Sequence, residues 1–211
     1  MAPQMAIETY LRSRAISLSM PPCLRFHPNL RHPSGTYWPA MVAQMKAPGG
    51  NAIHRTWLAK DGSGKAPIAD PKMLLGSCYG GAIQLYKPGP TLLIAEGIEN
   101  ALSGTQATGY QSWDAGSARM FKNLTVPACN RHVIILADND EAGIREADHA
   151  ADRWRRYGKR ISIALPDEGD WNDMLKVGRS ADIGDSLSRS LGLQHPSPRC
   201  PADTKRRVPT S

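Results

Sequence analysis

Short apolar segments alternate with amphipathic ones in the second half of the chain. Four segments have the pattern of strands, at residues 91–95, 109–113, 132–137 and 160–165. An apolar run without polar alternation is typical of a strand that is buried on both faces, as in a parallel sheet. Residues 141–157 place their apolar side chains on one helix face, and Gly158 can end that helix. The alternation predicts an α/β fold with a parallel sheet flanked by helices.

The first half of the chain has a different pattern. It is rich in Pro and Gly and has short strand candidates at 37–45, 52–58 and 82–86, which predicts a small mixed-β subdomain. The pattern changes at the sequence KPGP, residues 87–90. We therefore divide the chain into an N-terminal helical segment (1–20), a mixed-β basic subdomain (21–87), an α/β domain (88–178) and a basic tail that we predict to be disordered (179–211).

Charge is distributed unevenly along the 211 residues. The net charge is +7, and residues 1–90 alone carry 10 Lys and Arg against 3 Asp and Glu. Residues 91–177 carry 10 basic and 13 acidic side chains. This is the layout expected if the first half binds a polyanion and the second half binds metal ions. An ordinary uneven surface would give the same totals, so charge alone does not decide between the two.

Several classes of protein are disfavoured by the composition. No apolar run approaches the roughly 20 residues needed to span a bilayer, and the first residues lack the apolar core of a signal peptide. The four cysteines are far apart and form no CxxC pair, which argues against a zinc ribbon or a disulfide framework. They are Cys23, Cys78, Cys129 and Cys200. We expect a cytoplasmic protein without a membrane partner.

Acidic residues follow three of the four predicted strands. Glu96 follows the first, Asp138 and Asp140 follow the third, and Asp170 comes after the fourth. In a parallel sheet these positions share the edge where ligands bind. Crowded carboxylates are the usual ligands of Mg²⁺, with Mn²⁺ as an alternative. Taken singly, however, Asp140 and Asp170 could cap helices and Glu96 could be a surface residue.

A metal site of this kind suits phosphoryl or nucleotidyl transfer. Asp138 and Asp140 would bind the metal with support from Asp170, and Glu96 would be a further ligand or a general acid or base. Arg55, Lys65 and Lys72 in the basic subdomain are candidates for contact with nucleic-acid phosphates or with a nucleotide. Solvated strand edges, which lysine commonly protects, explain these basic residues equally well.

The acidic pattern resembles the Toprim domain of primases and topoisomerases. That family pairs a strand-end Glu-Gly with a later Asp-x-Asp, as in Glu96-Gly97 and Asp138-Asn139-Asp140, and residues 169–175 (GDWNDML) resemble the third acidic motif of primases. Asn100 and Asn172 stand where bacterial primases often have Asp. These two changes remove carboxylates but leave the Glu and Asp-x-Asp core.

The segment before this region, from about residue 21, resembles the corresponding part of primase-like proteins of phages, plasmids and integrated elements. This resemblance implies a primase core that makes short RNA primers from nucleoside triphosphates on single-stranded DNA, with Arg55 and Lys72 facing template or nucleotide. The chain has neither the CxxC pairs of a zinc-binding domain nor a GxxxxGK[ST] loop. A separately encoded helicase or zinc-binding domain would then be its partner.

Two other functions stay open on the sequence. One is a Toprim nuclease, which uses similar acids to cut DNA or RNA. The other is a catalytically inactive, nucleic-acid-binding remnant in a mobile element. A topoisomerase is less favoured, because no tyrosine can be assigned from the sequence as the nucleophile.

Overall fold

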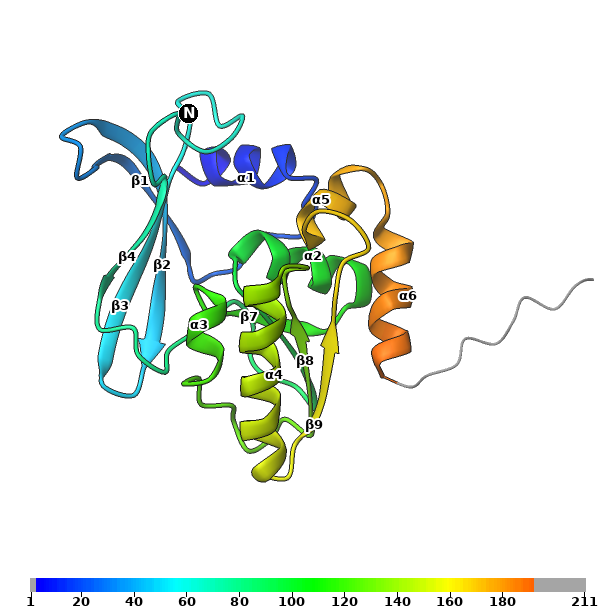
Figure 1. The fold of residues 1–211 in the computed structure, drawn as a ribbon. Helices are drawn as coiled ribbons and strands as arrows, with labels where there is room; N and C mark the ends of the chain where they lie inside the picture. The colour runs from blue at the N-terminus through cyan, green and yellow to red at the C-terminus, as the bar shows by residue number, and fades with distance from the viewer. Residues whose placement is uncertain (1–2, 192–211) are drawn as a thin grey trace, which may run out of the picture.

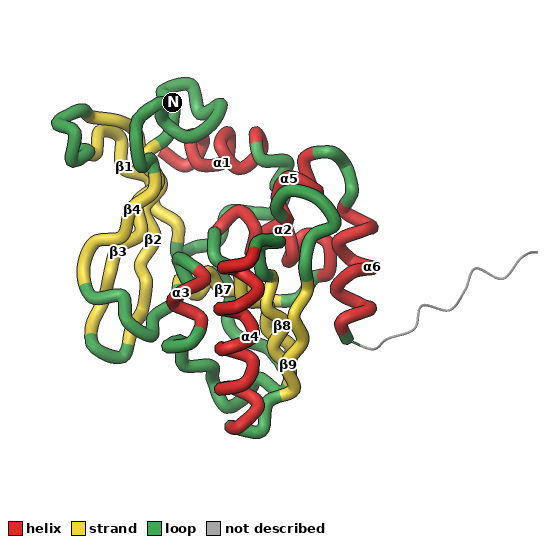
Figure 2. The backbone as a smooth tube through the Cα atoms, in the orientation of Figure 1, coloured by secondary structure: helices red, strands yellow, loops and turns green. Residues whose placement is uncertain are grey.

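Two β-sheets form the framework of the protein (Figure 1). The structure is a computed structural model that describes residues 3–191. One sheet is antiparallel with strand order β1-β2-β3-β4, and the other has the order β5-β7-β6-β8-β9. Figure 2 shows that the helices cluster around the second sheet and leave much of the first uncovered. The fold is therefore mixed α/β, with an antiparallel sheet preceding a largely parallel one, as the sequence predicts.

The antiparallel sheet is built from the basic first half of the chain. Its strands are β1 (Leu24–Arg31), β2 (Tyr37–Ala47), β3 (Gly50–Trp57) and β4 (Lys72–Gly76). Alternation in β2 sets the two faces, because Met41, Ala43 and Met45 are buried whereas Gln44 and Lys46 are exposed. The buried face packs on the same core as the second sheet.

The second sheet has four parallel strands and one antiparallel edge. The parallel strands are β6 (Thr91–Ala95), β7 (Gln111–Asp114), β8 (His132–Leu136) and β9 (Arg160–Ala164), and β5 (Ile83–Gln84) pairs antiparallel to β7. Leu92 to Ala95 and Val133 to Leu136 are completely buried. Their uninterrupted apolar pattern thus reflects helices on both sides of the sheet.

Helices cover both faces of this sheet. On one face, α3 (Ala118–Phe121) and α4 (Glu141–Arg156) share a core with Leu92, Ile94 and Ile135. On the other face, α2 (Ile98–Thr108), α5 (Trp171–Lys176) and α6 (Ser180–Ser190) pack with Leu93 and Ile134. No helix in the described part of the chain is both long and apolar enough to cross a membrane.

The N-terminal helix connects the two halves of the molecule. This helix, α1 (Pro3–Ser13), lies across one end of both sheets (Figure 1). Ile7, Tyr10 and Leu11 are buried in the core that also contains β2 and the helices on the α2 side. The helix predicted near the N-terminus is present, and it is an integral part of the core.

Two of the predicted boundaries need correction. The prediction of a disordered tail from residue 179 is wrong for 180–190, which form α6 with Ile183 and Leu187 fully buried. The rest of that tail, from residue 192, lies outside the described residues. Strand β5 falls within the predicted subdomain 21–87, yet it pairs with β7 of the second sheet. The chain therefore enters the second sheet before the KPGP sequence.

The burial of Leu187 gives a test of the first correction. We expect Leu187→Ala to lower the free energy of unfolding by about 2–5 kcal/mol, because truncating a buried leucine loses packing and leaves a cavity. Leu75 is 56% exposed, and Leu75→Ala is a matched control that should change stability by less than about 0.5 kcal/mol. Denaturant titration measures both values. Equally small effects in the two variants would support the original prediction that residues 180–190 are disordered.

Candidate active site

The candidate site lies at the carboxyl ends of the parallel strands. Strands β6 and β8 are hydrogen-bonded neighbours, with Ala95 opposite Leu136, so the residues that follow them emerge side by side. Glu96 follows β6 directly, and Asp138 lies two residues beyond β8. Asp170 comes after β9 and the loop that follows it, and it is the N-cap of α5. The parallel register therefore brings acids from three strands to one edge.

These acids line a cavity of about 300 Å³ together with basic side chains from the first half of the chain. Its acidic side chains are Glu96, Glu99, Asp138 and Asp170, and its basic side chains are Arg14, Lys65 and Lys72. The acids come from the second sheet and its helices, whereas the bases come from the end of α1 and from the loop and strand after β3. The cavity thus lies between the two halves of the molecule.

The surroundings of Asp138 shift the pKa of its carboxyl group well above the ordinary value. Its Oδ1 accepts a hydrogen bond from Asn100 Nδ2 at 3.2 Å. Burial raises the pKa of Asp138 to about 7, and the carboxylates of Glu96, Asp170 and Asp140 add to the increase. Like charges close together in a poorly solvated place disfavour ionisation. The protein therefore does not fully neutralise the negative charge around Asp138.

Glu96 and Asp170 are both held by backbone N–H groups. Glu96 Oε2 accepts a hydrogen bond from the backbone of Ala118, at the start of α3, at 2.9 Å. Asp170 caps α5, and its Oδ1 accepts from the backbone of Asp173 at 2.7 Å. The capping role considered for Asp170 from the sequence is real, and the same residue also lines the cavity.

Asp140 is placed differently from the other predicted acids. It caps α4, and its Oδ1 accepts a hydrogen bond from the backbone of Gly143 at 2.6 Å. It lines a neighbouring cavity with Asp148 and His149, not the one around Asp138. Glycine is required at 143, because a Cβ there would lie 2.7 Å from the backbone oxygen of Asp138.

Of the predicted basic residues, two line the cavity and one does not. Lys65 and Lys72 are in its wall. Arg55 instead lies over the ring of Trp57, 5.0 Å from its centroid, and its Nη2 donates to the backbone oxygen of Leu74 at 3.4 Å. Arg55 therefore belongs to the antiparallel sheet and stands apart from the cavity wall.

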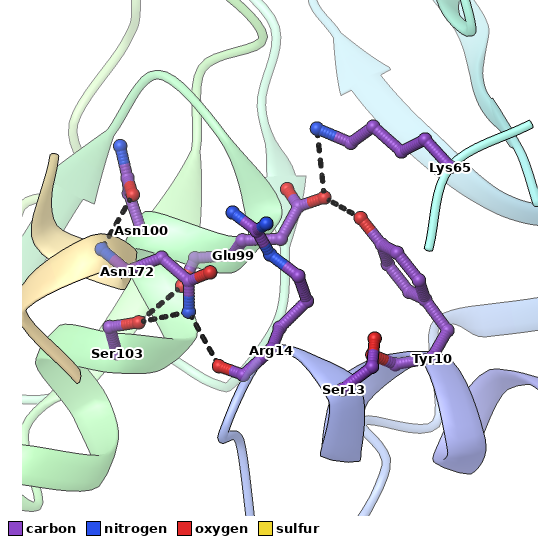
Figure 3. Close-up of polar contacts among 8 residues, drawn as sticks. All are labelled: Tyr10, Ser13, Arg14, Lys65, Glu99, Asn100, Ser103 and Asn172. Carbon is purple, nitrogen blue, oxygen red and sulfur yellow. Dashed lines mark hydrogen bonds and ion pairs between the residues drawn. The ribbon is translucent and has the colours of Figure 1, made fainter. Parts of the chain in front are cut away.

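Asn100, which lines the cavity, and Asn172 form an amide network (Figure 3). Asn172 donates its backbone N–H to Asn100 Oδ1 at 3.1 Å. Its Nδ2 donates to the backbone oxygen of Arg14 at 2.8 Å and to Ser103 Oγ at 3.0 Å. Since Asn100 Nδ2 donates to Asp138, this network connects the end of α1 to the acidic cluster.

The sequence of residues 91–180 matches the profile of the family described as the Toprim domain. This match covers the four parallel strands, the acids at their ends and helices α2 to α5. Residues 91–180 form a Toprim domain. Residues 2–85 match a separate family described only as a domain of unknown function (DUF7146). A comparison with curated proteins gives no match.

Solved structures of primases share the fold of most of this chain. The zinc-binding and RNA polymerase domains of the Aquifex aeolicus primase match with a TM-score of 0.59 at 17% identity, over 88% of this chain and 55% of that one. The DnaG catalytic core matches with a TM-score of 0.58 at 14% identity, over 91% and 78%. The primase fragment of the bacteriophage T7 primase-helicase matches with a TM-score of 0.52 at 18% identity, over 71% and 63%.

These matches establish a primase-like fold around the Toprim domain. This chain spans less than two thirds of the T7 fragment and of the Aquifex aeolicus chain.

Three residues at or near the site were missed by the sequence analysis. Arg14 and Glu99 line the cavity, but neither lies at the end of a strand. Asp114 ends β7 and is completely buried; burial raises its pKa to about 7, although the backbone N–H of Gly116 opposes the increase. A search for acidic residues directly after predicted strands could have found Asp114, because the predicted strand 109–113 ends one residue before it.

Toprim domains generally bind divalent metal ions, and the donors present here fit such an ion. Glu96, Asp138 and Asp170 offer the oxygen ligands that hard divalent cations prefer. A cation would also offset the burial and the repulsion that together raise the pKa of Asp138. Within residues 3–191, no three His, Cys, Asp or Glu side chains are already close enough to hold a metal ion. The carboxylates would have to draw together around it.

The raised pKa of Asp138 predicts an unusual pH dependence of stability. Asp138 titrates at about 7 in the folded protein and at about 4 when unfolded. The folded state therefore binds more protons between these values, and stability falls as the pH rises through this window. Asp138→Asn removes this loss.

We therefore expect Asp138→Asn to raise the melting temperature in EDTA at pH 8, with the difference from wild type shrinking as the pH falls towards 4. Thermal unfolding at several pH values measures this difference. Addition of Mg²⁺ at pH 8 should stabilise the wild type and not the variant. A difference that stays constant with pH would show that Asp138 is ionised throughout.

Proposed function

We propose that this protein is a primase-like nucleotidyltransferase that makes short RNA primers on single-stranded DNA with the help of Mg²⁺ or Mn²⁺. The observation that carries the proposal is the cavity itself, which combines the carboxylates of Glu96, Asp138 and Asp170 with the cations of Lys65 and Lys72. A nucleoside triphosphate bound to a divalent ion needs both, because its phosphates are anionic and its metal is cationic.

The acids divide into metal ligands and a group that moves a proton. Asp138 and Asp170 would hold the ion, which supplies charge neutralisation between the attacking and leaving oxygens. Glu96 would act as a further ligand or as the base that accepts the proton of the primer hydroxyl. Asp140 would join the ligands only by releasing the backbone of Gly143, which it now caps.

The antiparallel sheet would hold the template strand. Its four strands contain five Lys and Arg residues and no Asp or Glu. Arg55 belongs to this set, together with Arg25, Arg31, Lys46 and Lys72. Lys and Arg side chains that no neighbouring carboxylate in these strands neutralises attract the phosphates of single-stranded DNA in a salt-dependent way.

The solved structures describe related complexes. One is a DnaG catalytic domain bound to single-stranded DNA, which matches with a TM-score of 0.54 at 15% identity. Another contains T7 primase domains bound to an RNA/DNA hybrid and dTTP, with a TM-score of 0.52 at 17% identity. By analogy, we propose single-stranded DNA and nucleoside triphosphates as substrates. A separately encoded helicase or zinc-binding domain would be the partner, in the cytoplasmic replication of a phage or plasmid.

One feature favours an inactive nucleic-acid-binding remnant as the second candidate. The positions of two family carboxylates are occupied by Asn100 and Asn172, and the side-chain Nδ2 of each donates hydrogen bonds within the protein. The cavity consequently has fewer anionic ligands than a bacterial primase offers its metals. Activity measurements must therefore include a test of binding alone.

Substitution of Asp138 tests the proposed chemistry. We expect Asp138→Asn to lower primer synthesis at least about 100-fold, since metal ligation contributes several kcal/mol to such reactions. Asp152, an exposed acid on α4 paired with Arg155, gives the control Asp152→Asn, which should retain full activity. The assay supplies single-stranded DNA, four ribonucleotides and either Mg²⁺ or Mn²⁺, and the products are separated by length.

The same reactions distinguish the alternatives. Shortened DNA or RNA that depends on Asp138 would identify a nuclease. Salt-dependent DNA binding that is identical in wild type and Asp138→Asn, without any turnover in either metal, would identify the remnant.

Because Lys72 lines the cavity and Arg55 does not, we expect substitutions at these two positions to affect the binding of different ligands. We expect Lys72→Gln to weaken nucleoside triphosphate binding about tenfold, because it removes a cation from the cavity wall. Arg55→Gln should leave that affinity unchanged, weaken single-stranded DNA binding and reduce its salt dependence by about one ion. Fluorescence titrations with each ligand at several salt concentrations measure both effects. Loss of nucleotide affinity in Arg55→Gln would show that the nucleotide site extends along the antiparallel sheet beyond Lys72.

A further inference from the structure

Glu99 is a buried charge at the cavity wall that the proposed reaction does not use. It is the second residue of α2 and is only 6% exposed. Its Oε1 accepts a hydrogen bond from the hydroxyl of Tyr10 and lies 3.4 Å from Lys65 Nζ. Figure 3 shows both partners approaching this one carboxylate.

The three residues come from three different parts of the fold. Tyr10 is on α1 and is fully buried, Lys65 lies between β3 and β4, and Glu99 belongs to the Toprim domain. The contact therefore joins the N-terminal helix, the basic subdomain and the Toprim domain at one point. In the described structure, Lys65 is the cation paired with Glu99, and it also lines the cavity.

The charge on Glu99 is kept by its partners. Burial alone would raise the pKa of Glu99, but Lys65 and the Tyr10 hydroxyl lower it to about 2. A carboxylate that is so weakly basic is a poor proton acceptor. An ion pair that includes a buried carboxylate is costly to form, and in some proteins such a pair fixes a particular arrangement. Glu99 is thus better suited to hold other groups than to react.

A second bridge holds the same end of α1. The backbone oxygen of Arg14 accepts a hydrogen bond from Asn172 Nδ2 at 2.8 Å, and the Arg14 side chain lines the cavity. Tyr10 and Arg14 lie one helical turn apart. The two bridges together fix where Arg14 and Lys65 stand relative to the acids of the Toprim domain.

We infer that Glu99 is a positioning residue, which through Lys65 and Tyr10 holds the basic wall of the cavity at the separation from its carboxylate wall that a metal-bound nucleoside triphosphate requires. This inference rests on the proposed function and adds to it a residue that touches neither metal nor nucleotide. Lys65 is the group through which Glu99 acts on the phosphates.

Separate measurements of metal and nucleotide binding test this role. The probes are Mn²⁺ alone, followed by electron paramagnetic resonance of the free ion, and ATP with Mg²⁺, followed by calorimetry. We expect Glu99→Gln to weaken ATP binding about tenfold and to leave Mn²⁺ affinity within about twofold of wild type. Lys65→Met should weaken ATP binding at least as much. The double variant should be no weaker than Lys65→Met, because the two residues act in sequence.

Tyr10→Phe serves as a second variant that keeps the buried ring. It removes one of the two partners of Glu99 and should weaken ATP binding about threefold without changing Mn²⁺ affinity. Melting temperatures give an independent readout of the pair. Lys65→Met leaves the buried Glu99 without its cation and should lower the melting temperature more than Glu99→Gln does, and the double variant should recover part of that loss.

The other outcomes overturn the inference in distinguishable ways. Loss of Mn²⁺ affinity in Glu99→Gln would make Glu99 a metal ligand. Unchanged or tighter ATP binding in that variant would make Glu99 a purely structural residue or one that restrains Lys65. Additive losses in the double variant would separate Glu99 from Lys65. Absence of ATP binding in the wild type would instead refute the proposed function, and the role of Glu99 would fall with it.

Discussion

The parallel pairing of β6 with β8 is the constraint on which the site depends. Because Ala95 is paired with Leu136, Glu96 and Asp138, which follow these strands, emerge at the same edge of the sheet. The strands are fully buried on both faces, so their register is fixed by the core and not by the acids. The fold therefore places Asp138 where burial and the neighbouring carboxylates raise its pKa, and either a proton or a bound cation would relieve the repulsion.

Neutralisation of this edge comes from outside the Toprim domain. Arg14 and Lys65 precede it in the chain and reach the cavity only because α1 and the antiparallel sheet pack on the same core. Lys65 is shared between the buried Glu99 and the open cavity. Charge balance at the site is consequently a property of the whole fold, and the division of the chain into a binding half and a catalytic half is too simple.

The sequence predicted what depends on local pattern and missed what depends on tertiary contact. The apolar runs of β6 and β8 and the acids that follow them could be read directly, since burial on two faces leaves an unbroken apolar signature. Strand β1, with polar and apolar residues in no regular alternation, was not predicted, and α6 was taken for part of a tail because only Ile183 and Leu187 are fully buried in it. Glu99 and Arg14 could not be predicted from the sequence. Neither follows a predicted strand, and their partners lie in distant segments of the chain. The predicted roles of Glu96, Asp138, Asp140 and Asp170 stay predictions.

The two asparagines show how a loss of charge can serve an acidic site. A carboxylate at position 100 could only repel the ionised form of Asp138, whereas the Asn100 amide donates a hydrogen bond to it at 3.2 Å. Asn172 in turn holds Asn100 Oδ1 through its backbone N–H, which fixes the orientation in which the Asn100 amide donates. Hydrogen bonds to an ionised group favour its charge, so the amides lower the electrostatic cost of keeping Asp138 ready for a cation. They also remove two anionic ligands, and the remaining carboxylates of Glu96, Asp138 and Asp170 balance less cationic charge than five acids would. The two asparagines thus favour the ionised form of Asp138. They also limit how much positive metal charge the site can neutralise.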